Sequence, residues 1–193
     1  MSLLLRQSEY SGETFEGLSH SGADLREIQF EDCVFRGCQF SGASFVRARF
    51  IGCIFENCDL SNIDLTSARL RDCAFRQCKL LGVQWTQAED LINPTYEGCN
   101  LSLANFMGLK LKKTRFSACA LRETEFSQTD LGECDFRESD CLNARFNQTS
   151  LLKSDFRGAT NYLINPMENK IKGAKFSLPE AQGLLAGLGI ILE

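Results

Sequence analysis

A large apolar side chain returns at every fifth residue through much of the N-terminal half of this chain. From Phe30 to Phe75 every fifth position is Phe or Leu, and the position two residues earlier is Ile, Cys or Ala. A helix repeats its apolar positions at three and four residues and a strand at two, so a period of five fits neither element. Two inward positions in every five residues indicate a chain that turns a corner after each pentapeptide, and self-similarity at a fixed period is typical of a solenoid.

The aromatic residues add a longer period of twenty, with a single step of twenty-one. Four pentapeptides therefore make one coil, and residues one coil apart are expected to stack in columns. Backbones paired side by side lie ~4.8 Å apart, so eight coils predict a rod ~40 Å long. The aromatic column consists of Phe15, Phe35, Phe55, Phe75, Tyr96, Phe116, Phe136, Phe156 and Phe176.

This pattern resembles the pentapeptide-repeat family, which implies an all-β solenoid, namely a right-handed quadrilateral β-helix. We expect one rod over residues 1–160 with a phase slip at 86–95. The extra residue predicts a bulge or slight kink near Asp90–Pro94, because Pro94 falls where Cys73 would stack. Residues 161–193 are expected to form a degenerate last coil, a short helix and a tail. The first coil keeps the phase only loosely, which predicts an irregular cap over the upper edge.

Nine of the ten cysteines, all except Cys141, occupy the small inward position. A thiol there acts as a small hydrophobe, so we expect packing in a reduced, cytoplasmic protein. The cysteines lack the usual zinc spacing, and no metal or cofactor is expected. The sequence contains no run of eighteen apolar residues, so no membrane span is predicted. The net charge of −4 does not suggest direct binding of nucleic acid along the chain.

Charged residues separate in the second half of the rod. Lys110, Lys112, Lys113 and Arg115 form a basic band. Seven acids then follow within one coil, all at outward positions, and predict an acidic collar around the rod; the alternative is a solvated face. The collar consists of Glu123, Glu125, Asp130, Glu133, Asp135, Glu138 and Asp140.

The C-terminal residues predict a helix that caps the rod. Ser177 is expected to cap it with Glu180, Pro179 to lie in its first turn, and Gly187 or Gly189 to end it. Its apolar face should cover the lower edge of the rod, and the apolar tail should meet a second copy. The expected dimerisation residues are Leu178, Leu184, Leu185, Leu188, Ile190, Ile191 and Leu192.

The residues contain no recognisable catalytic set. His20 is the single histidine, and it continues the column of Phe40, so a capping role is favoured over catalysis. No phosphate-binding GxxxxGK[ST] motif is present. We therefore expect a binding protein and not an enzyme. Val34 and Ile54 share one outward flank, which is either a partner contact or simply a mildly apolar surface.

Three segments are similar to the family members that protect DNA gyrase and topoisomerase IV from poisons such as albicidin, microcin or quinolones. These are Phe30-Glu-Asp-Cys33, Asn161-Tyr162, and the residues Ala174 to Ala181 before the Leu-rich helix. The resemblance implies a homodimer that mimics DNA and binds the topoisomerase, with the albicidin-resistance type most similar. Many quinolone-protection members carry long loops, whereas this chain has one inserted residue. The alternative function is a scaffold or adaptor with an unrelated protein partner.

Overall fold

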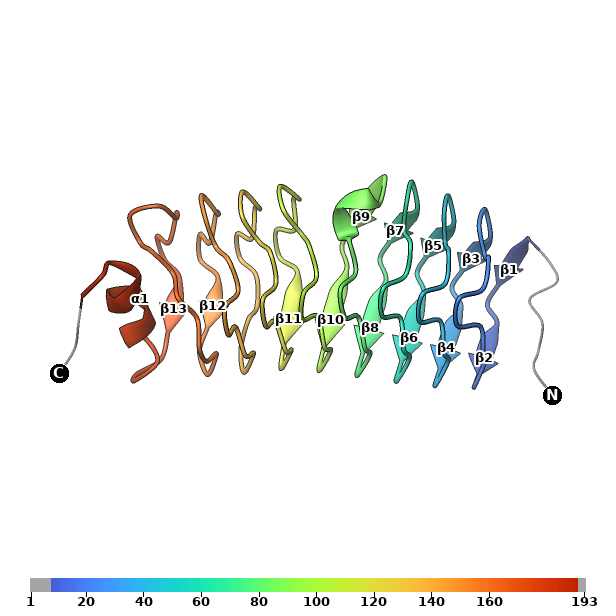
Figure 1. Ribbon diagram of the computed structural model, residues 1–193, viewed down its shortest axis with the longest axis horizontal. Coiled ribbons are helices and arrows are strands. Elements are labelled where there is room, and N and C mark those ends of the chain that lie inside the picture. Colours follow the sequence, from blue (N-terminus) through green and yellow to red (C-terminus); the bar gives the residue numbers. More distant parts are fainter. Residues whose placement is uncertain (1–7, 191–193) are drawn as a thin grey trace.

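The computed structural model describes residues 8–190, which form a single rod of stacked coils with a short helix at its C-terminal end (Figure 1). The strands are two or three residues long because the chain turns a corner after each one. They are β1 Glu9–Ser11, β2 Thr14–Glu16, β3 Gln29–Glu31, β4 Val34–Arg36, β5 Arg49–Ile51, β6 Ile54–Glu56, β7 Arg69–Arg71, β8 Ala74–Arg76, β9 Asp90–Ile92, β10 Thr95–Glu97, β11 Arg115–Ser117, β12 Asp155–Phe156 and β13 Lys175–Phe176.

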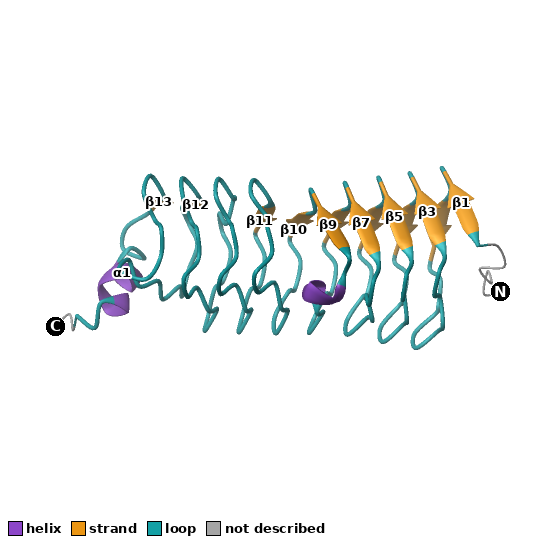
Figure 2. Ribbon diagram, turned by 90° about the horizontal axis from the view of Figure 1, so that it is seen from above, coloured by secondary structure: helices purple, strands orange, loops and turns teal. Residues whose placement is uncertain are grey.

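All strand pairs are parallel and join residues one coil apart. One sheet has the order β1-β3-β5-β7-β9, a second β11-β10-β8-β6-β4-β2, and a third contains β12 and β13. Figure 2 shows the first sheet along one side of the N-terminal half, while most of the C-terminal half is drawn as loops. Isolated parallel bridges, such as Gln39 with Asp59 and Ser44 with Asp64, continue the pairing on the other sides. The expected four-sided β-solenoid is therefore confirmed.

The four sides are called faces 1 to 4 below. Their central inward residues in one coil are Phe35 on face 1, Phe40 on face 2, Phe45 on face 3 and Phe50 on face 4. Each face also includes the outward residue before that centre and the two residues after it. The second of these two is the corner, where the backbone usually takes a positive φ; Asn57, for example, has a φ of 54°.

The core is a set of stacked columns, as the period of twenty predicts. Successive rings in the aromatic column from Phe15 to Phe176 lie 4.6–5.3 Å apart with interplanar angles of 8–16°. His20 stacks on Phe40 with ring centroids 6.3 Å apart, as its column position predicts. Offset stacking adds to the burial of each ring, so neighbouring coils stabilise one another.

The extra residue lies earlier than the predicted bulge. A 3-10 helix, η1 Trp85–Gln87, takes up the insertion, and β9 already pairs with β7 in the new register, with Leu91 opposite Leu70. The prediction of a bulge near Asp90–Pro94 is therefore wrong. Pro94 is buried on the Cys73 column, and the inter-coil bond there runs from the Thr95 N–H to the Cys73 carbonyl. A proline at position 94 leaves this bond intact.

The first described coil is more regular than expected. β1 and β2 pair in register with β3 and β4, and Leu18 is buried at a small inward position. Backbone pairing to the second coil tolerates imperfect side chains, so the expected irregular cap is wrong for residues 8–29. Both edge strands are short and carry glutamates, Glu9 and Glu16, which discourage pairing with another sheet.

The C-terminal helix α1 Gln182–Gly187 covers the end of the rod, but with a different face from the one predicted. A Cβ at Gly183 or Gly187 would overlap the carbonyl oxygen of Tyr162 or Ile164, so the glycines permit a close approach. Only Leu184 of the predicted apolar face packs against the core as a partly buried side chain. Leu178, Leu185, Leu188 and Ile190 are exposed.

The ends of α1 also differ in part from the prediction. Ala181 is the N-cap and makes no side-chain capping bond. The Ser177 hydroxyl accepts a hydrogen bond from the Gly158 N–H and donates one to Glu180 at 3.5 Å. The expected contact between Ser177 and Glu180 is therefore present, but Ser177 does not cap the helix. Gly189 follows the helix with a φ of 74°, which agrees with its expected role in ending it. Ile191 and Leu192 of the predicted dimerisation set lie outside the described residues.

Candidate functional site

The cysteines pack in the interior of the rod. All ten are buried and free. Many thiols donate to a main-chain carbonyl of the preceding coil, as Cys58 does to Phe35 at 3.4 Å. In the C-terminal half buried threonines and serines use the same geometry, as Thr129 does to Phe106 at 2.9 Å. The predicted packing role is confirmed, and the equivalence of Cys with Thr and Ser was not foreseen.

The described residues do not include a group of three or more His, Cys, Asp or Glu that could hold a metal ion. No helix within residues 8–190 is long and apolar enough to cross a membrane. The surface hollows are shallow and lie on the flanks of the rod. Candidate functional residues are therefore those of the outer surface, and the seven collar acids are the first set to consider.

The collar acids lie at outward positions on all four faces, as predicted. Face 1 holds Asp135 and Glu138, and face 2 holds Glu123 and Asp140. Face 3 holds Glu125, and face 4 holds Asp130 and Glu133. None of the seven is buried.

Basic side chains from neighbouring positions pair with four of these acids. Ion pairs join Asp140 to Arg122 at 2.6 Å, Asp135 to Arg137 at 2.7 Å, Glu133 to Lys112 at 3.1 Å and Glu125 to Arg145 at 3.7 Å. Among the described residues Glu123, Asp130 and Glu138 make no ion pair. The collar is thus less negative than its sequence of seven acids and one arginine suggests.

The pKa values of the paired acids follow these contacts. The hydrogen bond from Lys112 lowers the pKa of Glu133, and the hydrogen bond from Arg137 lowers that of Asp135. Partial burial opposes ionisation of Asp140, but hydrogen bonds from Asn161 and Arg122 outweigh it and lower the pKa. These carboxylates stay ionised at neutral pH and are held by their partners.

The basic band divides between two faces. Lys110, Lys112 and Lys113 lie on face 4, and Arg115 lies on face 1 in β11. Lys112 and Lys113 both approach Glu133, at 3.1 and 3.9 Å. The basic band and the acidic collar therefore meet on face 4 and partly neutralise each other there.

The apolar flank predicted from Val34 and Ile54 is a continuous column. Val34 pairs with Ile54 and Ile54 with Ala74 across β4, β6 and β8, and all three are half-buried. Their outward surface is therefore a narrow apolar strip along face 1.

Basic residues outside ion pairs gather on face 4, which the sequence analysis missed. Across residues 8–190 eight basic side chains make no ion pair. Arg115 and Lys175 lie on face 1, two residues after the corner residues of face 4. The other six belong to face 4 itself. This clustering can be found in the sequence when residues twenty apart are compared, but not when charged runs along the chain are examined. The six are Arg49, Arg71, Lys110, Lys153, Lys170 and Lys172.

Comparison with known proteins agrees with this architecture. A model described as the pentapeptide repeat region matches residues 28–106, and a model of pentapeptide repeats in eight copies matches residues 99–137 and 124–160. A rod of parallel, four-sided coils built from pentapeptides is a pentapeptide-repeat β-solenoid. The chain belongs to the pentapeptide-repeat family. No curated protein sequence matches it.

Solved structures of QnrB1, described as a plasmid-mediated fluoroquinolone resistance protein, are similar along nearly the whole rod. One trypsin-treated variant has a TM-score of 0.73 at 23% identity, covering 96% of this chain and 90% of that one. A second trypsin-treated variant, with a different substitution, has a TM-score of 0.64 at 24% identity with the same coverage. The full-length form has a TM-score of 0.51 at 26% identity, covering 94% and 90%.

Proposed function

We propose that this chain is a binding protein that docks on DNA gyrase or topoisomerase IV in the cytoplasm and protects the enzyme from its poisons. The observation that carries the proposal is the similarity over 96% of the chain to a fluoroquinolone resistance protein. That similarity extends over a rod with a capped C-terminal end. The residues most similar to topoisomerase-protecting family members lie at that end and at the start of the regular coils.

The proposed mechanism is local mimicry of DNA. Duplex DNA carries one charge per ~1.7 Å, or more than about twenty over ~40 Å. A chain of net charge −4 cannot match that density along its length. The collar acids without ion pairs, Glu123 and Glu138 above all, offer a local negative surface on faces 1 and 2. A basic DNA-binding surface of the enzyme is the complementary partner.

Dimerisation through the C-terminal end would present two collars to a two-fold symmetric enzyme. Leu178, Leu185, Leu188 and Ile190 are exposed around α1, and an apolar surface of this kind favours contact with a second copy. We expect the Leu185→Glu, Leu188→Glu variant to sediment as a monomer while the native chain sediments as a dimer. A native chain that sediments as a monomer at micromolar concentration would remove this part of the proposal.

Charge reversal in the collar tests the binding site. Because Glu123 and Glu138 make no ion pair, Glu123→Lys with Glu138→Lys should leave the fold intact. We expect gyrase to bind this variant at least about tenfold more weakly in a surface-immobilised assay, since each close like-charge contact disfavours association. The matched control reverses Glu13 and Glu31, which are exposed and also outside ion pairs, and should change affinity less than about twofold.

Equal loss in the collar variant and in the Glu13 and Glu31 control would show that only net charge matters. Unchanged binding of both variants would contradict the electrostatic mechanism. The alternative, an adaptor with an unrelated partner, requires that gyrase fail to bind the native chain.

A further inference from the structure

From its third coil onward face 4 is positively charged, although the molecule as a whole is negative. Between Arg49 and Gly173 it carries nine basic and five acidic residues, a net charge of +4, whereas its first two coils carry the acids Glu9, Glu31 and Asp32. Since the chain has a net charge of −4, all positions outside this segment together carry −8. The basic residues are Arg49, Arg69, Arg71, Lys110, Lys112, Lys113, Lys153, Lys170 and Lys172, and the acidic ones are Asp72, Glu89, Asp90, Asp130 and Glu133, of which Glu89 forms an ion pair with Arg69.

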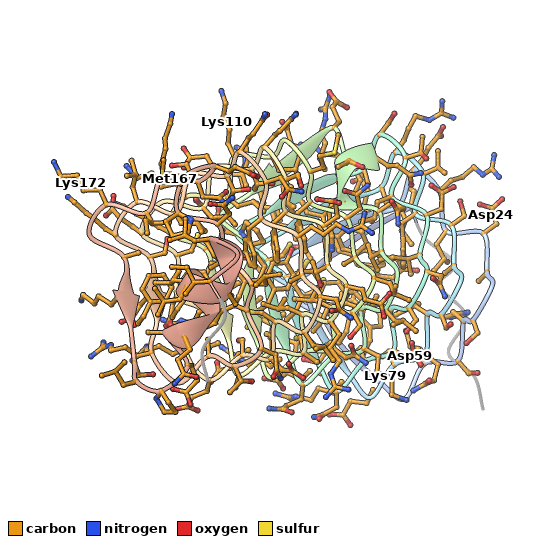
Figure 3. The ribbon with its side chains drawn as sticks, turned by 60° about the vertical axis from the view of Figure 1, so that its left-hand side comes forward. Asp24, Asp59, Lys79, Lys110, Met167 and Lys172 are labelled. Atoms are coloured by element: carbon orange, nitrogen blue, oxygen red, sulfur yellow. The ribbon has the colours of Figure 1, made fainter. Side chains whose placement is uncertain are left out.

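The backbone pairing places these residues on one side of the rod. Arg49 pairs with Arg69 and Arg69 with Asp90 in the first sheet. Further along, bridges link Lys110 to Asp130, Asp130 to Ser150, and Ser150 to Lys170. Lys110 and Lys172 point to the same side in Figure 3.

Each half of face 4 contains a hollow with an aliphatic side chain next to basic ones. In the first half Ile51 lies among Arg49, Arg69 and Arg71, and Asp90 also lines the hollow. In the second half Leu152 lies in a hollow that Lys112 and Lys153 line together with the acids Asp130 and Glu133. Gly132 stands between Lys112 and Leu152 in the same column, and its missing side chain opens this second hollow.

We propose that face 4 binds an acidic segment of a partner protein, with one aliphatic side chain of that segment in each hollow. The six cations of face 4 that make no ion pair attract carboxylates without a competing partner, whereas Arg69 and Lys112 are already paired with Glu89 and Glu133. The aliphatic hollows add apolar contact. This surface goes beyond the gyrase-binding collar, because most of its residues belong to neither the collar nor the C-terminal end.

Two features favour an acidic protein segment over nucleic acid. Ile51 and Leu152 offer nothing to a phosphate backbone, and no aromatic side chain is among the exposed large hydrophobic residues of the described chain. Proteins that bind single strands stack bases on such aromatic side chains. A long duplex along this face would also meet the acids Glu9, Glu31 and Asp32 of the first two coils, whereas a short acidic segment would contact the basic part of face 4 alone.

The spacing of the hollows sets the length of the segment. Ile51 and Leu152 are about five coils apart, which is ~24 Å at the inter-coil spacing. An α-helix spans that distance in about sixteen residues. An acidic helix with two aliphatic residues about sixteen positions apart therefore fits both hollows.

The test measures the binding of a fluorescein-labelled, glutamate-rich helical peptide whose only two leucines are about sixteen residues apart. We expect the native chain to bind it at micromolar concentration, and more weakly as salt increases. The triple variant Arg71→Gln, Lys110→Gln, Lys172→Gln should bind at least about tenfold more weakly. The control Arg76→Gln, Arg122→Gln, Arg145→Gln makes the same charge change on the other three faces, and should stay within about twofold.

A second pair of variants tests the hollows. Leu152→Ser should weaken peptide binding about fivefold, whereas Leu142→Ser, at an exposed leucine on face 2, should not. Three results would overturn the proposal. They are no peptide binding by the native chain, equal loss in both triple variants, and tighter binding of a labelled DNA duplex that Leu152→Ser does not affect. The last result would instead assign face 4 to nucleic acid.

Discussion

At the residue scale the inward positions were readable from the sequence, and their hydrogen bonds were not. Two apolar positions in every five residues are sufficient to place Phe35 or Cys58 in the core, because only those positions are shielded from water. The bond from Cys58 to the Phe35 carbonyl depends on how one coil lies over the next. That geometry also explains why Thr129 is tolerated in the core.

Tyr96 is the residue-scale exception in the aromatic column. Its ring stacks between Phe75 and Phe116, but its hydroxyl is buried without a hydrogen-bond partner. A buried unsatisfied polar group costs about 1–3 kcal/mol. We therefore expect Tyr96→Phe to raise the free energy of unfolding by about 1 kcal/mol or more, measured by urea denaturation.

The matched control for Tyr96 is Phe116→Tyr, which adds a hydroxyl one coil further along the same column. It should lower the stability by a similar amount. If Tyr96→Phe lowers stability instead, the Tyr96 hydroxyl must have a partner in solution.

Burial also determines the titration of the thiols. It raises the pKa of Cys53 and of Cys134 to about 12, whereas an unfolded thiol ionises near ~8.5. The unfolded chain thus loses thiol protons at lower pH than the folded chain. The stability that these protonated thiols provide is complete below pH ~8.5 and declines as pH increases toward about 12.

The decline should be about 1.4 kcal/mol per pH unit for each thiol. Burial also raises the pKa of Cys73. Replacing Cys53 and Cys73 by Ala, which occupies equivalent positions at Ala48 and Ala68, should therefore make the alkaline decline in stability shallower by about twice that amount. Parallel pH–stability curves for the native chain and this variant would show that these thiols do not titrate as described.

At the element scale the existence of the one-residue insertion and of the C-terminal helix was predicted, but the position of the insertion and the packed face of the helix were not. The step of twenty-one was evident, yet its placement near Pro94 was wrong because proline is a conspicuous disruptor. The spacing from Leu70 to Leu91 already shows that the slip is complete before Pro94. At the C-terminus, the glycines of α1 lie four residues apart on one helical face, and that face, rather than the leucine face, packs on the rod.

The packing of α1 gives an element-scale prediction. Gly183→Ala with Gly187→Ala places methyl groups against the carbonyl oxygens of Tyr162 and Ile164, so the helix must move away. We expect hydrogen exchange at residues 182–187 to become at least about tenfold faster, while the coils of the rod keep their protection. The control Ala186→Ser changes an exposed position of the same helix and should have little effect. Unchanged exchange in the double variant would contradict the close packing of α1.

At the scale of the whole molecule, period and fold were predictable, but the charge distribution was not. The acidic collar was found as a run along the chain, and its residues do surround the rod. A run, however, does not show which cations approach from the next coil, as Arg145 approaches Glu125 at 3.7 Å. The basic face requires comparison of residues twenty apart, and the ion pairs that leave six of its cations without partners require the structure.

The measurement that tests the central claim most directly is DNA supercoiling by purified gyrase, titrated with this protein in the absence and presence of albicidin and of a quinolone. We expect the native chain to restore supercoiling in the presence of at least one poison, and to inhibit the enzyme alone only at high dose. The Glu123→Lys, Glu138→Lys variant should fail to restore it, and the Glu13→Lys, Glu31→Lys control should succeed. No effect of the native chain at any dose, with or without a poison, would contradict the proposed protection of gyrase.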